Sequence, residues 1–361
     1  MYGTFLKNLQ EKIMTEGAGA EGKTIKGEMD AICEAIESEI ISADMGQEEK
    51  AEMLKKLRRI AKTETNIMLV GATGCGKSST INALFACGQD AASQVEVAKV
   101  GSRTNPETKD IEKYTIGNLV LWDTPGLGDD TENDEHHKTV IRDLLNEEDE
   151  DGNSLIDLVL LVMDGSTRDL GTSYHILNDV IIPELQGETN RILVALNQAD
   201  IAMKTGRHWD YEKNAPDATL LEFLEEKVES IKTRIKDDSE LEVNPVYYCA
   251  GYQEEQGEVV HPYNLSKLLL YILNAIPAQK RVAIMENINV DSENYEYNDD
   301  EMDYGEAVKD SFLDSFEDFI SDGVDKGAEI GCMILGLPGA VVGAIIGGGV
   351  GCIRSILNEI F

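Results

Sequence analysis

Basic residues are scarce in this 361-residue chain. Lysine and arginine together number 32, against 68 aspartate and glutamate residues, so the formal net charge is −36. A protein that tracks along DNA or RNA needs many positive charges to neutralise phosphates. We therefore expect no extended nucleic-acid binding, although this net charge still allows a small basic pocket.

Cysteine pairs with metal-binding spacing are also lacking. The six cysteines lie far apart, form no C-x-x-C pair and have no histidine nearby at ligand spacing. This pattern argues against a disulfide framework or a zinc site and favours a reducing, cytoplasmic compartment. The first residues, MYGTFLKNLQEKIM, alternate charged and apolar positions. They lack the apolar core of a secretory signal peptide, so none is expected.

The spacing of apolar residues divides the chain into four regions. Residues 1–65 have helical spacing and predict two or three amphipathic helices. Residues 66–277 alternate short apolar runs with helical stretches, which predicts a mainly parallel sheet covered on both faces. Residues 278–307 are expected to be an acidic, solvated linker. Residues 308–361 form a C-terminal helical region that includes a glycine-spaced apolar segment, 323–353.

The expected sheet has six strands. One of them, Ile111–Ile116, is joined to the next run by Gly117-Asn118, a turn typical of hairpins, so this strand is expected to be antiparallel. The remaining five are Ile67–Val70, Leu119–Trp122, Leu158–Met163, Ile192–Leu196 and Val243–Tyr248.

A glycine-rich stretch follows the first expected strand and opens a helix. Residues 71–78 read GATGCGKS and fit the pattern G-x-x-x-x-G-K-S. Small residues let successive backbone N–H groups curl around phosphates, and the helix N-terminus adds a partial positive charge. In this pattern the Lys77 ammonium reaches the β- and γ-phosphates of a nucleotide, and the Ser78 hydroxyl binds Mg²⁺. The residues expected to hold the phosphates are Gly71, Thr73, Gly74, Cys75, Gly76, Lys77, Ser78 and Ser79.

Two further motifs end later strands. Residues 123–126 read D-T-P-G, which places Asp123 to hold the metal through a water and the Gly126 N–H to sense the γ-phosphate. Residues 197–200 read N-Q-A-D, in which Asn197 braces the pocket beside Gln198. Asp200 can accept hydrogen bonds from the N1–H and the exocyclic amine of guanine. Adenine lacks this pair of donors, so a buried carboxylate here rejects it.

A fourth, weaker element follows the last expected strand. Residues 248–251 read Y-C-A-G, and the Ala250 N–H is placed to meet the carbonyl oxygen of guanine, next to Cys249.

These four elements, in this order and each at a strand end, resemble the small GTP-binding domain and, within it, the bacterial Era-like GTPases. The resemblance covers about residues 66–277. It implies an α/β P-loop GTPase domain with a six-stranded, mainly parallel sheet, flanked by N- and C-terminal helical regions and binding GTP or GDP with Mg²⁺. It also implies that Thr108, with Thr104 as the alternative, closes on Mg²⁺ when the γ-phosphate is present. The implied catalytic residues are Lys77, Thr108 and Gly126, and the implied metal ligands are Ser78, Thr108 and Asp123.

Four positions depart from the family pattern. Gln198 replaces a lysine whose stem packs along the base, and Cys249 stands in the place of a serine. Gly74 occupies the position where potassium-activated relatives have an asparagine ligand. Leu127 follows D-T-P-G, where signalling GTPases carry a water-orienting glutamine. Leucine cannot position a water, so we expect slow hydrolysis unless an activator or a dimer supplies the missing group.

Glycine recurs at four-residue steps near the C-terminus. The glycines are Gly323, Gly327, Gly331, Gly339, Gly343, Gly347 and Gly351. Residues four apart share a helix face, so this spacing makes a smooth groove that another helix can approach. Residues 330–353 carry no charge and are long enough to cross a bilayer core as a helix. The two interpretations are membrane or oligomer contact and a buried helical hairpin against the N-terminal helices.

Three functions are compatible with the sequence. The leading one is a Mg²⁺-dependent GTP-binding switch that hydrolyses GTP slowly and acts on a protein effector of unknown identity. A homodimer is one oligomeric state compatible with it. The second is a membrane-active or self-assembling protein that the nucleotide domain gates, cytoplasmic but peripheral to or inserted in a membrane through 323–353. The third is a ribosome-associated assembly GTPase.

Overall fold

The computed structural model describes residues 25–42, 46–60, 62–86, 97–98, 111–126, 131–149, 152–185, 187–203, 208–253, 259–325 and 353–361. The expectations for Thr104, Thr108, Leu127 and most of the glycine-spaced segment lie outside the described residues. Those expectations therefore stay predictions.

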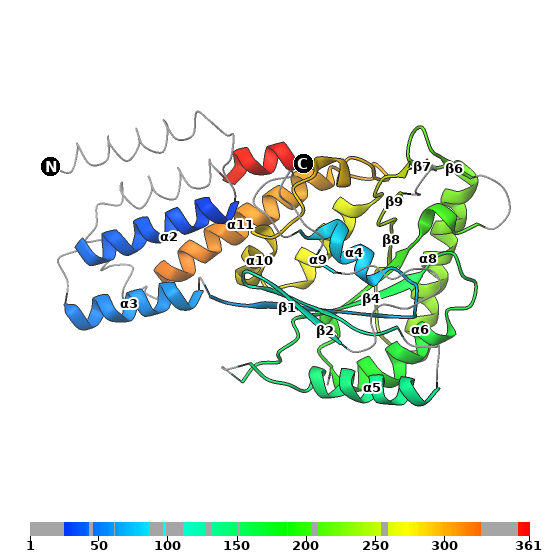
Figure 1. The fold of residues 1–361 in the computed structure, drawn as a ribbon, viewed down its shortest axis with the longest axis horizontal. Coiled ribbons are helices and arrows are strands. Elements are labelled where there is room, and N and C mark those ends of the chain that lie inside the picture. Colours follow the sequence, from blue (N-terminus) through cyan, green and yellow to red (C-terminus); the bar gives the residue numbers. More distant parts are fainter. Residues whose placement is uncertain are drawn as a thin grey trace.

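A six-stranded sheet forms the centre of the molecule, in the order β2-β3-β1-β4-β5-β8 (Figure 1). All neighbouring pairs are parallel except β2 and β3. The expected mainly parallel sheet with one antiparallel strand is confirmed. The final strand is shorter than expected, at two residues. The strands are β1 Thr65–Gly71, β2 Glu112–Ile116, β3 Leu119–Asp123, β4 Leu158–Asp164, β5 Ile192–Asn197 and β8 Val246–Tyr247.

The strand residues alternate between two hydrophobic cores, one on each face of the sheet. Ile67 and Leu69 belong to the core shared with α4, α9 and α10, whereas Met68 and Val70 belong to the core shared with α5 and α8. Both sets are buried because helices cover both faces, which is why the strands read as continuous apolar runs. The helices with their short extensions are α4 Lys77–Leu84, α5 Thr131–Leu145, α6 Gly171–His175, η1 Ile176–Ile181, α7 Ile182–Glu184, η2 Thr189–Arg191, η3 Ala199–Ile201, α8 Ala218–Ser239, α9 Leu265–Ala275 and α10 Ala278–Met285.

Two small hairpins complete the sheet domain. One pairs β6 Trp209–Asp210 with β7 Ala215–Pro216, and the other pairs β9 Tyr252–Gln253 with β10 Val259–Val260. Both follow strands of the central sheet and lie toward one end of the molecule in Figure 1.

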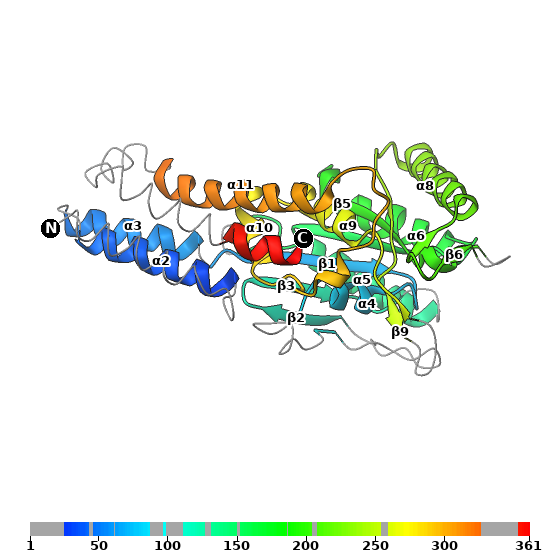
Figure 2. The same cartoon turned by 90° about the horizontal axis from the view of Figure 1, so that it is seen from above.

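A helical region from both ends of the chain extends away from the sheet (Figures 1 and 2). It contains α2 Ile25–Ser42, α3 Gln47–Ile60 and α11 Tyr304–Asp325, and α11 packs against α3, α9 and α10. The helical residues 353–360 lie beside the start of α11, where Lys309 donates to Asn358 Oδ1 at 3.1 Å. Of the helices in the described ranges, none has both the length and the apolar character needed to cross a membrane.

The stretch expected to be a solvated linker, 278–307, has ordered structure. It contains α10, a short turn η4 at Ser292–Asn294 and the first residues of α11. Ile284 and Met285 are fully buried in the main core, and Tyr295 is 5% exposed with its ring 4.7 Å from that of Phe361. The acidic residues alternate with aromatic and aliphatic ones, and the segment docks on the domain through the apolar side chains and through Asp299, whose side chain is 4% exposed. A count of charges along the chain does not reveal this alternation.

Candidate nucleotide-binding site

The glycine-rich loop between β1 and α4 has the backbone shape that its sequence predicts. Gly74 and Gly76 have φ angles of 76° and 94°, in the left-handed region that favours glycine. A Cβ on Gly71 would lie 2.2 Å from the Val162 carbonyl oxygen on β4. The loop therefore lies close against the sheet and leads into the N-terminus of α4, whose free N–H groups suit an anion.

Lys77 is the first residue of α4, and its side chain folds over this loop. The residue is 7% exposed, and its ammonium donates to the Gly71 and Ala72 carbonyl oxygens, both at 3.3 Å. Both hydrogen bonds are at the long end of the normal range. Phosphate oxygens carry more charge than these carbonyls, so the ammonium can exchange the two contacts for a stronger one.

Ser78 and Asp123 meet beneath the loop. The Ser78 hydroxyl donates to Asp123 Oδ2 at 2.6 Å, and Ser79 follows on the same turn of α4. Asp123 Oδ1 is buried and has no hydrogen-bond partner among the described residues. Burial raises the pKa of Asp123, and the Ser78 hydrogen bond and the Lys77 charge oppose this shift. A hydroxyl beside a buried carboxylate with an unpaired oxygen is a donor set that fits Mg²⁺, which prefers oxygen ligands.

The D-T-P-G turn lies directly against the glycine-rich loop. A Cβ on Gly126 would lie 2.3 Å from both Cα and Oγ1 of Thr73. The Thr124 hydroxyl donates to the Leu69 carbonyl oxygen at 2.8 Å, which fixes the turn to β1. The structure thus places Gly126 in close contact with Thr73 of the glycine-rich loop.

Asn197, at the end of β5, links the glycine-rich loop of residues 71–78, which we call the phosphate loop after its expected ligand, to the segment after β8. Its Nδ2 donates to the Cys75 carbonyl oxygen at 2.9 Å, and its Oδ1 accepts from the Ala250 N–H at 3.1 Å. A Cβ on Gly76 would lie 2.2 Å from Asn197 Nδ2, so only glycine fits between them. In this structure the Ala250 N–H, which the sequence assigns to a guanine oxygen, donates to Asn197.

Gln198 reaches the phosphate loop as well. Its Nε2 donates to the Gly74 carbonyl oxygen at 2.9 Å, and its φ of 61° turns the chain sharply after β5. The glutamine therefore connects the N-Q-A-D segment to the glycine-rich loop, although it lacks the long aliphatic stem of a lysine.

Asp200 and Cys249 form the part of the site expected to recognise the base. The Cys249 thiol donates to Asp200 Oδ1 at 3.1 Å, and Asp200 is 9% exposed. Asp200 Oδ2 is buried without a hydrogen-bond partner in the described part of the chain. Burial raises the pKa of Asp200, and the Cys249 hydrogen bond opposes this shift. An unpaired carboxylate oxygen in this position calls for a ligand that donates hydrogen bonds.

One link between the two halves of the site has no counterpart in the sequence motifs. The fully buried Tyr248 hydroxyl is 2.6 Å from Thr80 Oγ1, which in turn donates to the Gly76 carbonyl oxygen at 2.7 Å. Tyr248 thereby connects the segment after β8 to the helix that begins at the phosphate loop. The sequence signal for this link is a tyrosine directly after Tyr247, the last residue of β8.

These elements define the α/β P-loop GTPase fold, with the predicted motifs gathered at one edge of the sheet. A family model described as "50S ribosome-binding GTPase" matches residues 66–198, which contain the first two motifs and end within the third, before Asp200. The chain outside these residues, including both helical ends, is not covered by this match.

Two curated proteins are similar over parts of the chain. Interferon-gamma-inducible GTPase 10 of Mus musculus is 40% identical over 75 residues, 20% of this chain and 17% of that protein. The uncharacterized protein YkfA of Escherichia coli K12 is 29% identical over 167 residues, 45% of this chain and 51% of that protein. The chain thus spans about half or less of each of these relatives.

Two solved structures are similar to parts of the chain at low sequence identity. A probable GTP-binding protein, engB, is 20% identical, with a TM-score of 0.31 over 59% of this chain and 98% of its own. Era in complex with MgGDPNP and 16S ribosomal RNA nucleotides is 19% identical, with a TM-score of 0.36 over 60% of this chain and 57% of its own.

Proposed function

We propose that this protein binds GTP and GDP with Mg²⁺ and hydrolyses GTP slowly, as a nucleotide-state switch. The observation that carries this proposal is a pair of buried carboxylates, Asp123 and Asp200, each with one oxygen that has no partner in the described residues. One lies beside the Ser78 hydroxyl and fits a metal ion, while the other fits the donor pair of guanine. A Mg–guanine nucleotide satisfies both carboxylates at once.

The chain's own groups have separate tasks in this proposal. The phosphates lie over the N-terminus of α4, where backbone N–H groups and the Lys77 ammonium bind them. The Ser78 hydroxyl and the Asp123 carboxylate would hold Mg²⁺, which would supply charge neutralisation at the phosphates. Asn197 and Gln198 keep the phosphate loop and the base end at a fixed separation. Guanine donates to Asp200, and adenine leaves that carboxylate unpaired.

The rate and the readout are also part of the proposal. Leu127 follows the D-T-P-G turn and has no polar atom that can orient a water, which supports slow hydrolysis. Thr108, with Thr104 as the alternative, closes on Mg²⁺ when the γ-phosphate is present, and the Gly126 N–H binds that phosphate. Loss of the γ-phosphate therefore releases the segments that carry these residues. Ordering of loops by the γ-phosphate is the established way in which such domains switch.

The ribosome named in the matching family's description does not carry over to this chain. The matched residues hold the first two nucleotide motifs and the start of the third. Among the residues that the structure describes, no feature points to RNA. The net charge of −36 opposes binding to a phosphate-rich surface. The similarity to Interferon-gamma-inducible GTPase 10 and the resemblance to the Era-like group support nucleotide binding and nothing more specific.

Titration of the Lys77→Ala variant with GDP and Mg²⁺ tests the proposal. We expect an affinity loss of at least about 100-fold, because a charge-assisted contact to phosphate disappears from a buried site. Lys236→Ala is the matched control, since its ammonium pairs with Glu242 at 2.7 Å on the surface of α8, away from the loop. Unchanged GDP affinity in folded Lys77→Ala would contradict the assigned phosphate site.

A further inference from the structure

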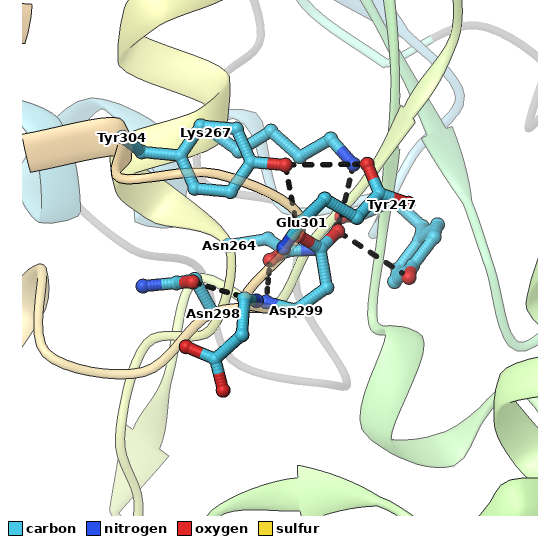
Figure 3. A network of polar contacts seen from close by, with 8 residues as sticks. Tyr247, Asn264, Lys267, Asn298, Asp299, Glu301 and Tyr304 are labelled. Atoms are coloured by element: carbon cyan, nitrogen blue, oxygen red, sulfur yellow. Dashed lines mark hydrogen bonds and ion pairs between the residues drawn. The ribbon is translucent and has the colours of Figure 1, made fainter. Parts of the chain in front are cut away.

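A buried ion pair connects α9 to the segment before α11, among residues that the nucleotide motifs do not include (Figure 3). The Lys267 ammonium, on α9, is 2.7 Å from Asp299 Oδ2 and 2.8 Å from Glu301 Oε2. The Lys267 and Asp299 side chains are 9% and 4% exposed. A buried ion pair adds little net stability, because desolvation offsets the Coulomb attraction. Its presence therefore suggests a role in fixing geometry.

Asp299 belongs to a short segment that we call the acidic strap, residues 295–303, which joins η4 to α11. Its backbone N–H donates to Asn264 Oδ1 at 2.9 Å, and its Oδ1 accepts from the Tyr304 hydroxyl at 2.8 Å. Burial opposes ionisation of Asp299, but the hydrogen bonds from Lys267 and Tyr304 outweigh it and lower the pKa of this carboxyl. The strap is thus fastened to the domain at an ionised, fully hydrogen-bonded carboxylate.

Asn264 connects the strap to β8, the strand that leads into the base end of the site. Its Nδ2 donates to the Tyr247 carbonyl oxygen at 3.1 Å and to Asp299 Oδ2 at 3.2 Å, and its N–H donates to the Tyr297 carbonyl oxygen at 2.9 Å. Asn264 is completely buried and has a φ of 54°. A non-glycine residue in this conformation costs free energy and persists only where its surroundings fix it. These contacts supply that fixation.

Tyr263, the residue before Asn264, is hydrogen-bonded directly to Cys249, which with Asp200 forms the base end of the site. Tyr263 and Cys249 exchange both backbone hydrogen bonds, each at 3.0 Å, and the Cys249 thiol donates to Asp200. Hydrogen bonds, together with the covalent links within residues 263–264 and within Cys249, therefore connect the strap to Asp200, the carboxylate assigned to guanine.

We propose that the acidic strap positions the base-binding residues: the Lys267–Asp299 pair holds Asn264, and through it residues 247–249, where Cys249 orients Asp200 toward guanine. This inference rests on the proposed function. The strap continues into α11 at Tyr304, and α11 packs against α3 in the helical region. The same contacts thus link the base end of the site to the helical region. Because linkage is reciprocal, guanine binding stabilises the strap as much as the strap favours guanine binding.

The preference for GDP over IDP measures this positioning. IDP lacks the exocyclic amine, so the ratio of the two affinities reports pairing with Asp200 and is insensitive to the phosphate contacts. In full-length Lys267→Met we expect the ratio to fall about tenfold, since a misplaced charged acceptor loses a hydrogen bond of that strength. We also expect GDP to slow hydrogen exchange of the Asp299 and Glu301 amides in the wild type and not in this variant.

The chain offers a matched control. Lys280 and Asp157 form another ion pair, at 2.6 Å with 18% and 9% exposure, where β1 and β4 begin, at the opposite edge of the sheet from the site. Lys280→Met should lower stability and leave the GDP-to-IDP ratio at the wild-type value. Should Lys267→Met fail to fold, Tyr304→Phe removes one hydroxyl contact to Asp299 and should lower the ratio about threefold.

Three outcomes overturn the inference. An unchanged ratio in the folded strap variant means that the strap only supports the fold. An equal loss of the ratio in Lys267→Met and Lys280→Met means general loosening of the domain. If the wild type binds neither GDP nor IDP, both the proposed function and this inference are wrong. The first two outcomes contradict the inference alone and leave the proposed function standing.

Discussion

Replacement of Asp200 by asparagine separates base recognition from every other property of the site. The side chain keeps its shape, and the introduced amide carbonyl can still accept the Cys249 thiol that now lies 3.1 Å from Oδ1. The change removes one acceptor oxygen, Oδ2, which is buried and unpaired in the described structure. In the variant, the exocyclic amine of guanine meets the amide NH₂ of the introduced asparagine, so two hydrogen-bond donors face each other.

The expected magnitude follows from the strength of that pairing. A hydrogen bond to a charged group contributes about 1.5–3 kcal/mol, so GDP affinity should fall roughly 10- to 100-fold. Xanthine carries a carbonyl oxygen where guanine has its exocyclic amine, and the introduced amide can donate to it. We therefore expect Asp200→Asn to bind XDP more tightly than the wild type does.

The nucleotide-free protein should respond in the opposite sense. Burial raises the pKa of Asp200, which means that the ionised carboxylate is unfavourable in the empty site. A neutral amide relieves this cost, so the melting temperature without nucleotide should rise while GDP affinity falls.

Isothermal titration with GDP, XDP and ADP, together with thermal unfolding of the free protein, measures all three effects. GDP affinity equal to that of the wild type, with no gain for XDP, would refute the assignment of Asp200 to the base.

Two further predictions concern the phosphate loop and the helical region. Gly76→Ala should abolish GDP binding, because its Cβ would lie 2.2 Å from Asn197 Nδ2. Gly187→Ala, at a similar φ of 95° but with no atom within 4 Å, should cost only about 1–2 kcal/mol and leave binding intact. If calorimetry shows the same loss of GDP affinity in both variants, backbone strain explains the loss and the contact with Asn197 does not. Burial, then Asp30, raise the pKa of Glu286 from 4.5 to about 7, against the charge of Lys26. The folded state thus keeps a proton that the unfolded state releases, so stability should fall by up to about 3 kcal/mol as pH rises from about 4.5 to 7 and stay lower above it. Glu286→Gln should remove that part of the slope in urea unfolding, and an unchanged slope would contradict the raised pKa.

Much of the sheet domain can be predicted from the sequence because its central strands are buried on both faces. Residues 158–163 form a continuous apolar run for that reason, and the glycine-rich loop has a shape that only its glycines at 74 and 76 permit. The hairpin at Gly117-Asn118 is likewise a local signal. Each of these features is decided by residues close together in the chain.

The features that were not predicted depend on contacts between distant residues. Asp299 lies within a run of acids and is indistinguishable there from its solvated neighbours, yet it pairs with a lysine 32 positions earlier. The Tyr248–Thr80 hydrogen bond joins residues 168 positions apart. Which acid or hydroxyl is buried follows from packing of α9, α10 and the strap, and the charge pattern contains no information on it.

The central claim is that one site holds the phosphates of a nucleotide and a distant aspartate selects its base. Calorimetry of the full-length wild type with Mg²⁺ and either GDP or ADP tests it most directly. We predict one GDP bound per chain and at least about 100-fold weaker binding of ADP, in keeping with an unpaired buried acceptor. Equal affinity for the two nucleotides, or heat with neither, would contradict the account.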